Sequence, residues 1–482
     1  MEMIRRVVFY IFFAVYIILC PLLILNSLGY IVYPFKEKLV HTGVIHLSSW
    51  PSGAQVFIEK SHYAETTPTT IRDLVPGEYS IRLELKGYHS WTQKVLVQDG
   101  KAAAFDKILL IPNDWNSKLL KSGSFKDLMP LPETDYFLLA RGDQFKDLSV
   151  YDWKKETAQP FLNIERDLAG LRFSSFFFRE ESAAVLVLAG PLWDRKYLYA
   201  QVTGKGAEVR DISKLIPERP LTLQWDPENP DNVFALYEGH VDRLDTVTSA
   251  FYPKYVEGVR GWGIARDQIY IIDENNNVLA SPIGKKDFKP AFESPELVDM
   301  LSREKDFYEI KPVAGNVVVF LGSHSSVIFA GRQPYLINEE LVGVKPDSDG
   351  RLLVWTEKSI GILDRSDQDE LKVSGGGFGK VRWVFGQGKD IRQCFWAHDG
   401  SHVVFRDGNN IFILESEPRG AAHLEPVTVS KENASVVYAE TKGVLYYLGA
   451  QDGKLYALDI VPRKSVAQVL LMEESALGKG DQ

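Results

Sequence analysis

The chain has 482 residues and carries 64 Asp and Glu residues against 55 Lys and Arg residues, a formal net charge of −9. Nucleic-acid-binding proteins carry clustered basic charge that neutralises phosphates, so this balance argues against that class. There are only two cysteines, and Cys20 lies in an apolar run far from Cys394, so no intrachain disulfide is expected.

An apolar run occupies residues 7–33, and no charged side chain lies between Arg6 and Lys36. A helix of this length would span about 40 Å, more than the roughly 30 Å hydrocarbon core of a bilayer. Pro21 would kink such a helix without forbidding it. The sequence therefore predicts that residues 1–36 form a short cytoplasmic tail and a transmembrane anchor.

A cleaved signal peptide and a lipoprotein anchored at Cys20 are the alternatives. The apolar run is longer than an ordinary signal-peptide core, and no small-x-small cleavage site follows it. Ile17, Ile18 and Leu19 precede Cys20, where lipid attachment requires a small residue. Basic residues before the run favour a cytoplasmic N-terminus, although the lysines just after it oppose this. We expect an uncleaved single-pass anchor in the cell membrane, with the bulk of the chain extracytoplasmic.

Residues 43–112 contain short apolar runs separated by turn signals. The turns lie at Pro51-Ser52-Gly53, at Pro76-Gly77 and at Asp99-Gly100. Turns at this spacing predict five or six strands in a small β-sandwich.

The same segment carries a family pattern, whose positions are Gly43, Ser49, Pro51, Gly53, Ala54, Val56, Thr67-Pro68, Leu74, Pro76-Gly77, Tyr79, Ile81, Gly87-Tyr88 and Trp91. In order and spacing they resemble the PEGA domain, named for its Pro-x-Gly-Ala core. The resemblance implies a surface-associated or envelope β-domain of unsettled molecular role. We expect the aromatic side chains at 79, 88 and 91 to pack the core rather than form a binding face.

Strand–turn–strand units recur about every 40 to 50 residues across residues 115–468, the kind of period that marks a repeat architecture. Representative units are 347–365, 397–416 and 434–460. Seven or eight such units predict a β-propeller, in which radial closure protects the sheet edges. Two stacked sandwiches are the alternative, and residues 469–482 are expected to be a frayed tail.

Two segments support the propeller by resemblance. The segment from Phe395 to Phe405 is similar to TolB-type and WD-like blades, and that from Trp225 to Val233 is similar to the turn of sortilin and BNR-type blades. The whole layout resembles bacterial proteins in which a PEGA domain joins a membrane anchor to a propeller. A short helix is expected at residues 294–306, where Ser and Pro begin an apolar pattern.

Motifs that could carry chemistry have simpler explanations. Four Asp-Gly pairs, which begin at residues 349, 399, 407 and 452, suit hairpin turns better than calcium loops. His398 and His402 bracket such a turn, where they are not expected to share a zinc ion. Gly375 to Gly379 is followed by a strand, unlike a phosphate-binding loop. We therefore predict no catalytic residue, metal or cofactor.

Aromatic side chains gather at Trp383, Phe385, Phe395 and Trp396. Packing within a blade is the simpler interpretation, and a stacking platform for sugar rings through Trp383, Phe385 and Trp396 is the alternative. The function expected from the sequence is a non-enzymatic, membrane-tethered binding or scaffold protein of the cell envelope, with an envelope protein as its partner. A cell-wall glycan ligand, or an enzyme acting on glycan or peptide in the central channel, is the alternative.

Overall fold

The computed structural model of the chain describes residues 2–27, 30–33, 38–132, 134–162, 166–179, 182–191, 193–229, 231–265, 268–303, 307–313, 317–330, 334–364, 381–417 and 423–461. The chain divides into two compact units. The first contains Met1–Trp115 with Glu417–Glu425 and Val461–Gln482, and the second contains Asn116–Ser416 with Pro426–Ile460. Strands dominate both units, so the prediction of a mainly β protein is confirmed.

The chain begins with helix α1 (Glu2–Ser27), followed by a hairpin of β1 (Tyr30–Tyr33) and β2 (Lys38–His41). Within the part of the chain that the structure describes, no helix is both long enough and apolar enough to cross a membrane. The transmembrane helix predicted from the sequence is therefore not supported. The predicted run and the observed helix differ in their bounds, because the end of the apolar run forms strand β1.

The PEGA-like segment forms two facing sheets. Their strands are β3 (Gly43–Trp50), β4 (Gln55–Ile58), β5 (Ser61–Thr66), β6 (Thr69–Leu74), β7 (Gly77–Glu84), β8 (Trp91–Val97) and β9 (Ala102–Leu109). One sheet has the order β6-β3-β9 and the other β5-β4-β7-β8. Burial alternates along β8, as expected for a strand with one face on a core. Trp91 is buried in this core, and Tyr79 and Tyr88 pack against it, as predicted.

Residues of the Pro-x-Gly-Ala region tie the two sheets together. The Thr67 hydroxyl lies 2.6 Å from the Ser49 hydroxyl and accepts a hydrogen bond of 3.0 Å from the Ala54 backbone N–H. Gly53 has a φ of 89°, a conformation that favours glycine. The family pattern therefore marks a buried hydrogen-bonded turn, which is a structural role.

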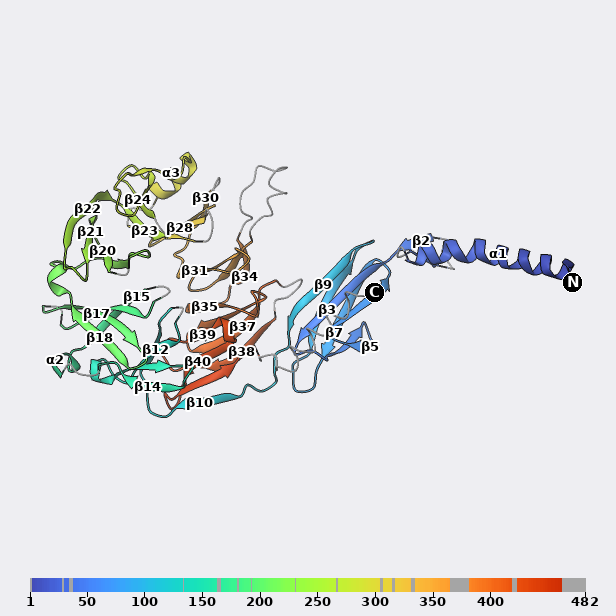
Figure 1. Cartoon of the computed structure of the whole chain (residues 1–482), viewed down its shortest axis with the longest axis horizontal. Helices are drawn as coiled ribbons and strands as arrows, with labels where there is room; N and C mark the ends of the chain where they lie inside the picture. Colours follow the sequence, from blue (N-terminus) through green and yellow to red (C-terminus); the bar gives the residue numbers. More distant parts are fainter. Residues whose placement is uncertain are drawn as a thin grey trace. The chain divides into compact units, whose positions relative to one another are not determined.

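The second unit contains six four-stranded antiparallel sheets and one eight-stranded sheet, which divides into two four-stranded antiparallel halves; these eight groups of four strands are called blades 1 to 8 below (Figure 1). Blade 1 contains β11 (Asp127–Pro130), β12 (Tyr136–Ala140), β13 (Leu148–Asp152) and β14 (Thr157–Pro160), and blade 2 contains β15 (Phe173–Phe178), β16 (Ala184–Ala189), β17 (Lys196–Thr203) and β18 (Gly206–Asp211). Blade 3 contains β19 (Thr222–Trp225), β20 (Asn232–Tyr237), β21 (Gly239–Asp245) and β22 (Phe251–Val259). Blade 4 contains β23 (Gly261–Ala265), β24 (Gln268–Ile272), β25 (Val278–Pro282) and β26 (Lys289–Pro290).

Blades 5 to 7 continue in the same way. Blade 5 contains β27 (Tyr308–Pro312), β28 (Val317–Leu321), β29 (Ser326–Ala330) and β30 (Pro334–Ile337). Blade 6 contains β31 (Gly343–Pro346), β32 (Leu352–Trp355), β33 (Ile360–Leu363) and β34 (Arg382–Phe385). Blade 7 contains β35 (Ile391–Ala397), β36 (His402–Asp407), β37 (Asn410–Glu415) and β38 (Leu424–Val429). Blades 4 and 5 also pair through their first strands, β23 and β27, in parallel.

Blade 8 takes strands from both ends of the propeller. Its first three strands are β39 (Val437–Ala439), β40 (Val444–Leu448) and β41 (Leu455–Asp459), and its fourth is β10 (Ser117–Lys121), which pairs antiparallel with β41. Apolar side chains of blade 8 then share one core with those of blade 1. The ring is thus closed by the start of the unit's own sequence, and within the described residues it has eight blades.

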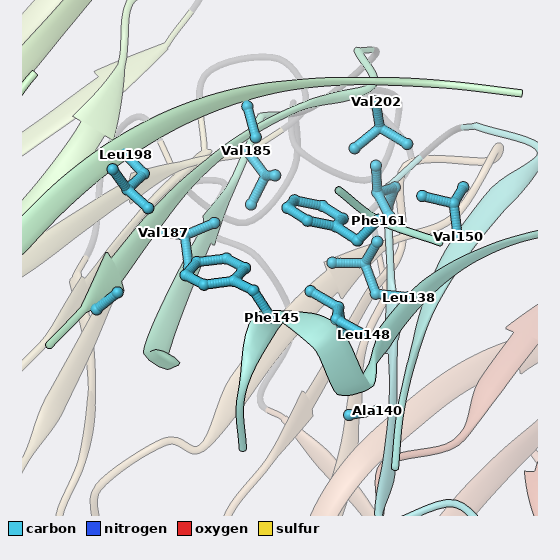
Figure 2. Close-up of a cluster of buried hydrophobic side chains, with 13 residues drawn as sticks. Leu138, Ala140, Phe145, Leu148, Val150, Phe161, Val185, Val187, Leu198 and Val202 are labelled. Carbon is cyan, nitrogen blue, oxygen red and sulfur yellow. The ribbon is translucent and has the colours of Figure 1, made fainter. Parts of the chain in front are cut away.

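Each inter-blade core is filled by the alternating apolar side chains of neighbouring sheets. Between blades 1 and 2, Phe145 and Phe161 stack with their ring centroids 5.9 Å apart (Figure 2). Valines of β16 surround them, and all the labelled side chains are almost completely buried. Because each blade buries both faces in this way, the strands read as near-continuous apolar runs.

The helix predicted at residues 294–306 is observed as α3 (Pro295–Ser302), inserted between blades 4 and 5. The Ser294 hydroxyl accepts a hydrogen bond of 3.3 Å from the Leu297 backbone N–H, which is the expected N-terminal cap. Residues 304–306 lie outside the described part of the chain, as do residues 462–468 of the predicted propeller and the predicted tail 469–482.

Replacing Phe145 with Ala tests the inter-blade packing. Phe145 is 1 % exposed, so the variant leaves a cavity between blades 1 and 2, and we expect the free energy of unfolding to fall by about 3–5 kcal/mol. Urea unfolding followed by circular dichroism measures the loss. The exposed Val247→Ala in the loop after β21 is the control and is expected to change stability by less than about 0.5 kcal/mol. Equal effects of the two variants would contradict the packing argument.

Candidate functional site

The aromatic platform of Trp383, Phe385 and Trp396, which is the alternative interpretation of the sequence, draws its residues from two blades: Trp383 and Phe385 lie on β34, and Trp396 lies on β35. Trp396 is 4 % exposed, and its indole N–H donates a hydrogen bond of 3.1 Å to the Lys345 carbonyl. Phe385 is partly buried, with its ring centroid 5.2 Å from that of Phe405. Of the three residues only Trp383 is exposed, at 42 %, on β34. Trp396 and Phe385 therefore contribute to packing, and Trp383 alone could meet a ligand.

The other sequence motifs have structural roles where they are described. The glycines of the four Asp-Gly pairs all have positive φ, as hairpin turns require. The rings of His398 and His402 lie 5.9 Å apart, and the Nδ1 of His402 lies 2.8 Å from the Ser401 hydroxyl. Among the described residues no group of three or more His, Cys, Asp or Glu side chains could hold a metal ion. The glycine-rich segment 375–379 lies outside the described residues.

Cys394 is buried in β35. Burial raises the pKa of its thiol well above the ordinary value, because no nearby charge compensates the desolvation of a thiolate. A thiol that stays protonated is a poor nucleophile. Cys394 is therefore a packing residue.

A polar and aromatic cluster joins the first strands of blades 6, 7 and 8, and we call it the inner-strand cluster. It consists of Lys345, Phe395, Tyr438 and Glu440. Lys345 pairs with Glu440 across the intervening blade, and its Nζ also lies 5.4 Å from the centroid of the Phe395 ring. The Phe395 and Tyr438 rings follow at a centroid distance of 6.0 Å. The cluster therefore links three consecutive blades.

The Tyr438 hydroxyl is buried and has no hydrogen-bond partner among the described residues. Burial raises the pKa of this phenol, and the negative charges of Glu440 and Asp399 raise it further. A phenol of raised pKa stays protonated at neutral pH, so it can donate a hydrogen bond but does not act as a base. The inner-strand cluster is suited to holding the blades or a ligand rather than to moving a proton.

No linear signal identifies this cluster. Lys345, Phe395 and Tyr438 lie in separate repeats, and only the ring brings their strands together. In the sequence Phe395 lies in one aromatic group with Trp383, Phe385 and Trp396. Its true neighbours come from blades 6 and 8.

Polar side chains also secure the closing blade. The Gln393 amide makes two hydrogen bonds to Val436, donating to its carbonyl at 3.1 Å and accepting from its N–H at 2.9 Å. From the other side, Asp127 accepts a hydrogen bond of 2.8 Å from the Ser435 N–H. The segment that leads into β39 is therefore held by blade 7 and by blade 1.

Asp127 is partly buried in this closure. Burial raises the pKa of its carboxyl above the ordinary 3.8, although backbone hydrogen bonds from Ser435 and Leu128 and the charge of Arg406 oppose the rise. A carboxyl whose pKa is higher in the folded state stabilises the fold most while it is protonated. That contribution is present below pH 3.8 and is lost as the pH rises through the folded pKa.

Asp127→Asn tests this linkage. Asn keeps the acceptor oxygen for Ser435 but does not titrate, so the stability of the natural chain should fall relative to the variant as the pH rises from about 3 to about 7. Urea unfolding at a series of pH values measures the difference. The same substitution at the exposed Asp459 on β41 is the matched control, because it also removes one carboxylate. If the difference in free energy of unfolding between the natural chain and Asp127→Asn does not change with pH, the argument is contradicted.

The family model of the PEGA domain matches residues 42–110. The β-sandwich is a PEGA domain. Its bounds agree with strands β3 to β9 and with the resemblance found in the sequence. No curated protein matches the chain in sequence.

The solved structures similar to the chain are β-propellers. They include the Cps50 (Swd1) β-propeller domain of Myceliophteria thermophila, at 11% identity and a TM-score of 0.35, covering 72% of this chain and 99% of that one. YCF48 bound to D1 peptide has 11% identity and a TM-score of 0.36, covering 73% and 97%. PorZ, a bacterial surface component of the type-IX secretion system of Porphyromonas gingivalis, has 11% identity and a TM-score of 0.41, covering 91% and 73%. The chain combines a PEGA domain with the β-propeller described above.

Proposed function

We propose that this chain is a non-enzymatic scaffold that binds a partner protein through the loops of its propeller. The observation that carries the proposal is the use of polar side chains between blades. Gln393 and Asp127 secure the closing blade, and Lys345 pairs with Glu440 across blade 7. These groups stabilise the ring by joining neighbouring blades. Their use in this way supports a role in presenting loops to a partner rather than a role in catalysis.

We further propose that the PEGA domain and the N-terminal helix place the propeller at a membrane of the cell envelope, with the bulk of the chain outside the cytoplasm. Helix α1 supports attachment because its large apolar side chains are exposed; they include Val8, Phe9, Tyr10, Ile11, Phe12, Phe13, Val15, Tyr16, Ile17, Leu19, Leu23 and Ile24. Surface of this kind gains free energy when it leaves water. The PEGA domain would then act as a spacer or as an envelope contact.

The second candidate is a cell-wall glycan ligand. The exposed ring of Trp383 favours it, because aromatic faces stack on sugar rings. The burial of Trp396 and the packing of Phe385 weaken it, because a single exposed ring makes a small platform. The protein-binding proposal therefore has the stronger support.

Crosslinking in intact cells tests the scaffold proposal. A photo-reactive residue is placed at exposed loop positions of several blades of the full chain, and crosslinked products are identified by mass spectrometry. We expect a small, reproducible set of envelope proteins that differs from any set captured when the probe replaces Leu96, an exposed residue of the PEGA domain. Recovery of glycan fragments alone would replace the proposal with the Trp383 alternative, and recovery of neither would overturn both.

Membrane attachment is tested separately. Changing Phe9, Phe12 and Tyr16 together to Ser removes exposed apolar area from α1, and we expect the chain to move from the membrane pellet to the supernatant on fractionation. Leu96→Ser is the control, because it removes an equally exposed apolar side chain elsewhere. A variant that stays in the pellet as fully as the natural chain would refute attachment through these side chains.

A further inference from the structure

Two neighbouring segments of blade 2 share one edge of the propeller, and together we call them the blade 2 rim. One is the turn between β16 and β17, and the other runs from the end of β18 to the start of β19. Two hydrogen bonds of 2.9 Å join the second segment to Tyr197, which follows the turn at the start of β17: the Tyr197 N–H donates to the Ser213 hydroxyl, and the Ile212 N–H donates to the Tyr197 carbonyl. The two segments therefore present their side chains together.

The blade 2 rim carries the two most exposed large apolar side chains among the described residues of the propeller. Trp193, in the first segment, is 88 % exposed, and Leu221, in the second, is 61 % exposed. The Trp193 turn is held by a hydrogen bond of 3.1 Å from the Asp194 N–H to the Pro191 carbonyl. The Leu221 N–H donates to the Leu236 carbonyl at 2.7 Å, which fixes the second segment on blade 3. Backbone hydrogen bonds thus hold Asp194, next to Trp193, and Leu221 itself.

Basic side chains accompany these two residues. Arg195 and Arg219 come one from each segment. Burial raises the pKa of the Tyr197 phenol, whereas the charge and a side-chain hydrogen bond of Arg195 and the charge of Arg219 oppose the rise. Lys214 is exposed on the second segment. Among the ion pairs of the described residues none uses Arg195, Arg219 or Lys214, whereas the neighbouring Lys196 pairs with Asp211 at 3.6 Å.

We infer that the blade 2 rim is a docking surface for an acidic peptide segment of a partner protein, with carboxylates on Arg195 and Arg219 and an apolar side chain against Trp193 and Leu221. This inference rests on the proposed scaffold function and names its surface. Guanidinium groups pair with carboxylates through two parallel hydrogen bonds, which gives direction as well as attraction. Trp, Tyr and Arg are also the residues that contribute most to protein interfaces.

The composition of the rim selects this ligand over a bare phosphate group or a polyanion. Those ligands use cations but have no use for the apolar area of Trp193 and Leu221. Asp194 and Glu218 are exposed in the same two segments, so a uniformly acidic chain would meet repulsion there. A segment that alternates carboxylate and apolar side chains satisfies both features.

Peptide display provides the test. A library of random 12-residue peptides is selected on the full chain in detergent micelles, and the affinities of enriched peptides are measured by fluorescence anisotropy. We expect enrichment of Asp or Glu beside Leu, Ile or Phe. Affinity should fall about tenfold or more with Trp193→Ala and with the double change Arg195→Glu and Arg219→Glu.

The matched control is Lys358→Glu with Lys389→Glu, which reverses the same number of charges on exposed loops of blade 6 and should leave affinity unchanged. Unfolding midpoints confirm that each variant folds. If Trp193→Ala does not fold, Leu221→Ser replaces it as the rim variant. Enriched peptides without acidic residues, peptides that bind the rim variants undiminished, or no enrichment at all would each overturn the docking surface. The scaffold function is decided separately by crosslinking in cells.

Discussion

The propeller depends on the pairing of β10 with β41. In the described residues, seven blades take their four strands from one continuous stretch of sequence, whereas blade 8 has only three of its own and borrows the fourth from the start of the unit. Without β10, strand β41 would expose an unpaired edge. Such edges attract other strands, so closure protects the ring as well as completing it. The hydrogen bonds of Gln393 and Asp127 hold the same blade in place from its two neighbours.

Closure also explains how the charged residues of the propeller are used. A ring of sheets has its apolar side chains between blades, and near its first strands the blades come close enough for polar groups to reach across. Lys345 and Glu440 meet in this way over the Phe395 ring. The result is a stiff frame whose variable parts are its loops, which is the arrangement expected of a binding scaffold. The blade 2 rim is the part of that frame where exposed apolar and basic side chains coincide.

The sequence was informative where local chemistry decides the structure. Turn signals and short apolar runs located the sandwich and the blade period, and the Ser294 and Pro295 pair located α3. It was less informative about contacts between repeats. Packing within one blade was the simpler interpretation for Trp396, but its indole N–H donates to the Lys345 carbonyl of another blade. The apolar run near the N-terminus was also divided between a helix and a strand, which hydropathy alone does not distinguish.

The closing strand has a mechanical consequence. Trp115 and Asn116 are one of the junctions between the two units, so tension passed along the chain from β9 of the PEGA domain enters the propeller at β10. Ser117 lies opposite Leu458 in an antiparallel ladder, and a pull along β10 acts on several of the ladder's hydrogen bonds at once rather than opening them one by one. The force therefore acts first on blade 8, where β10 closes the ring. When a tethered chain is under tension, the pairing of β10 with β41 is loaded before the other blades.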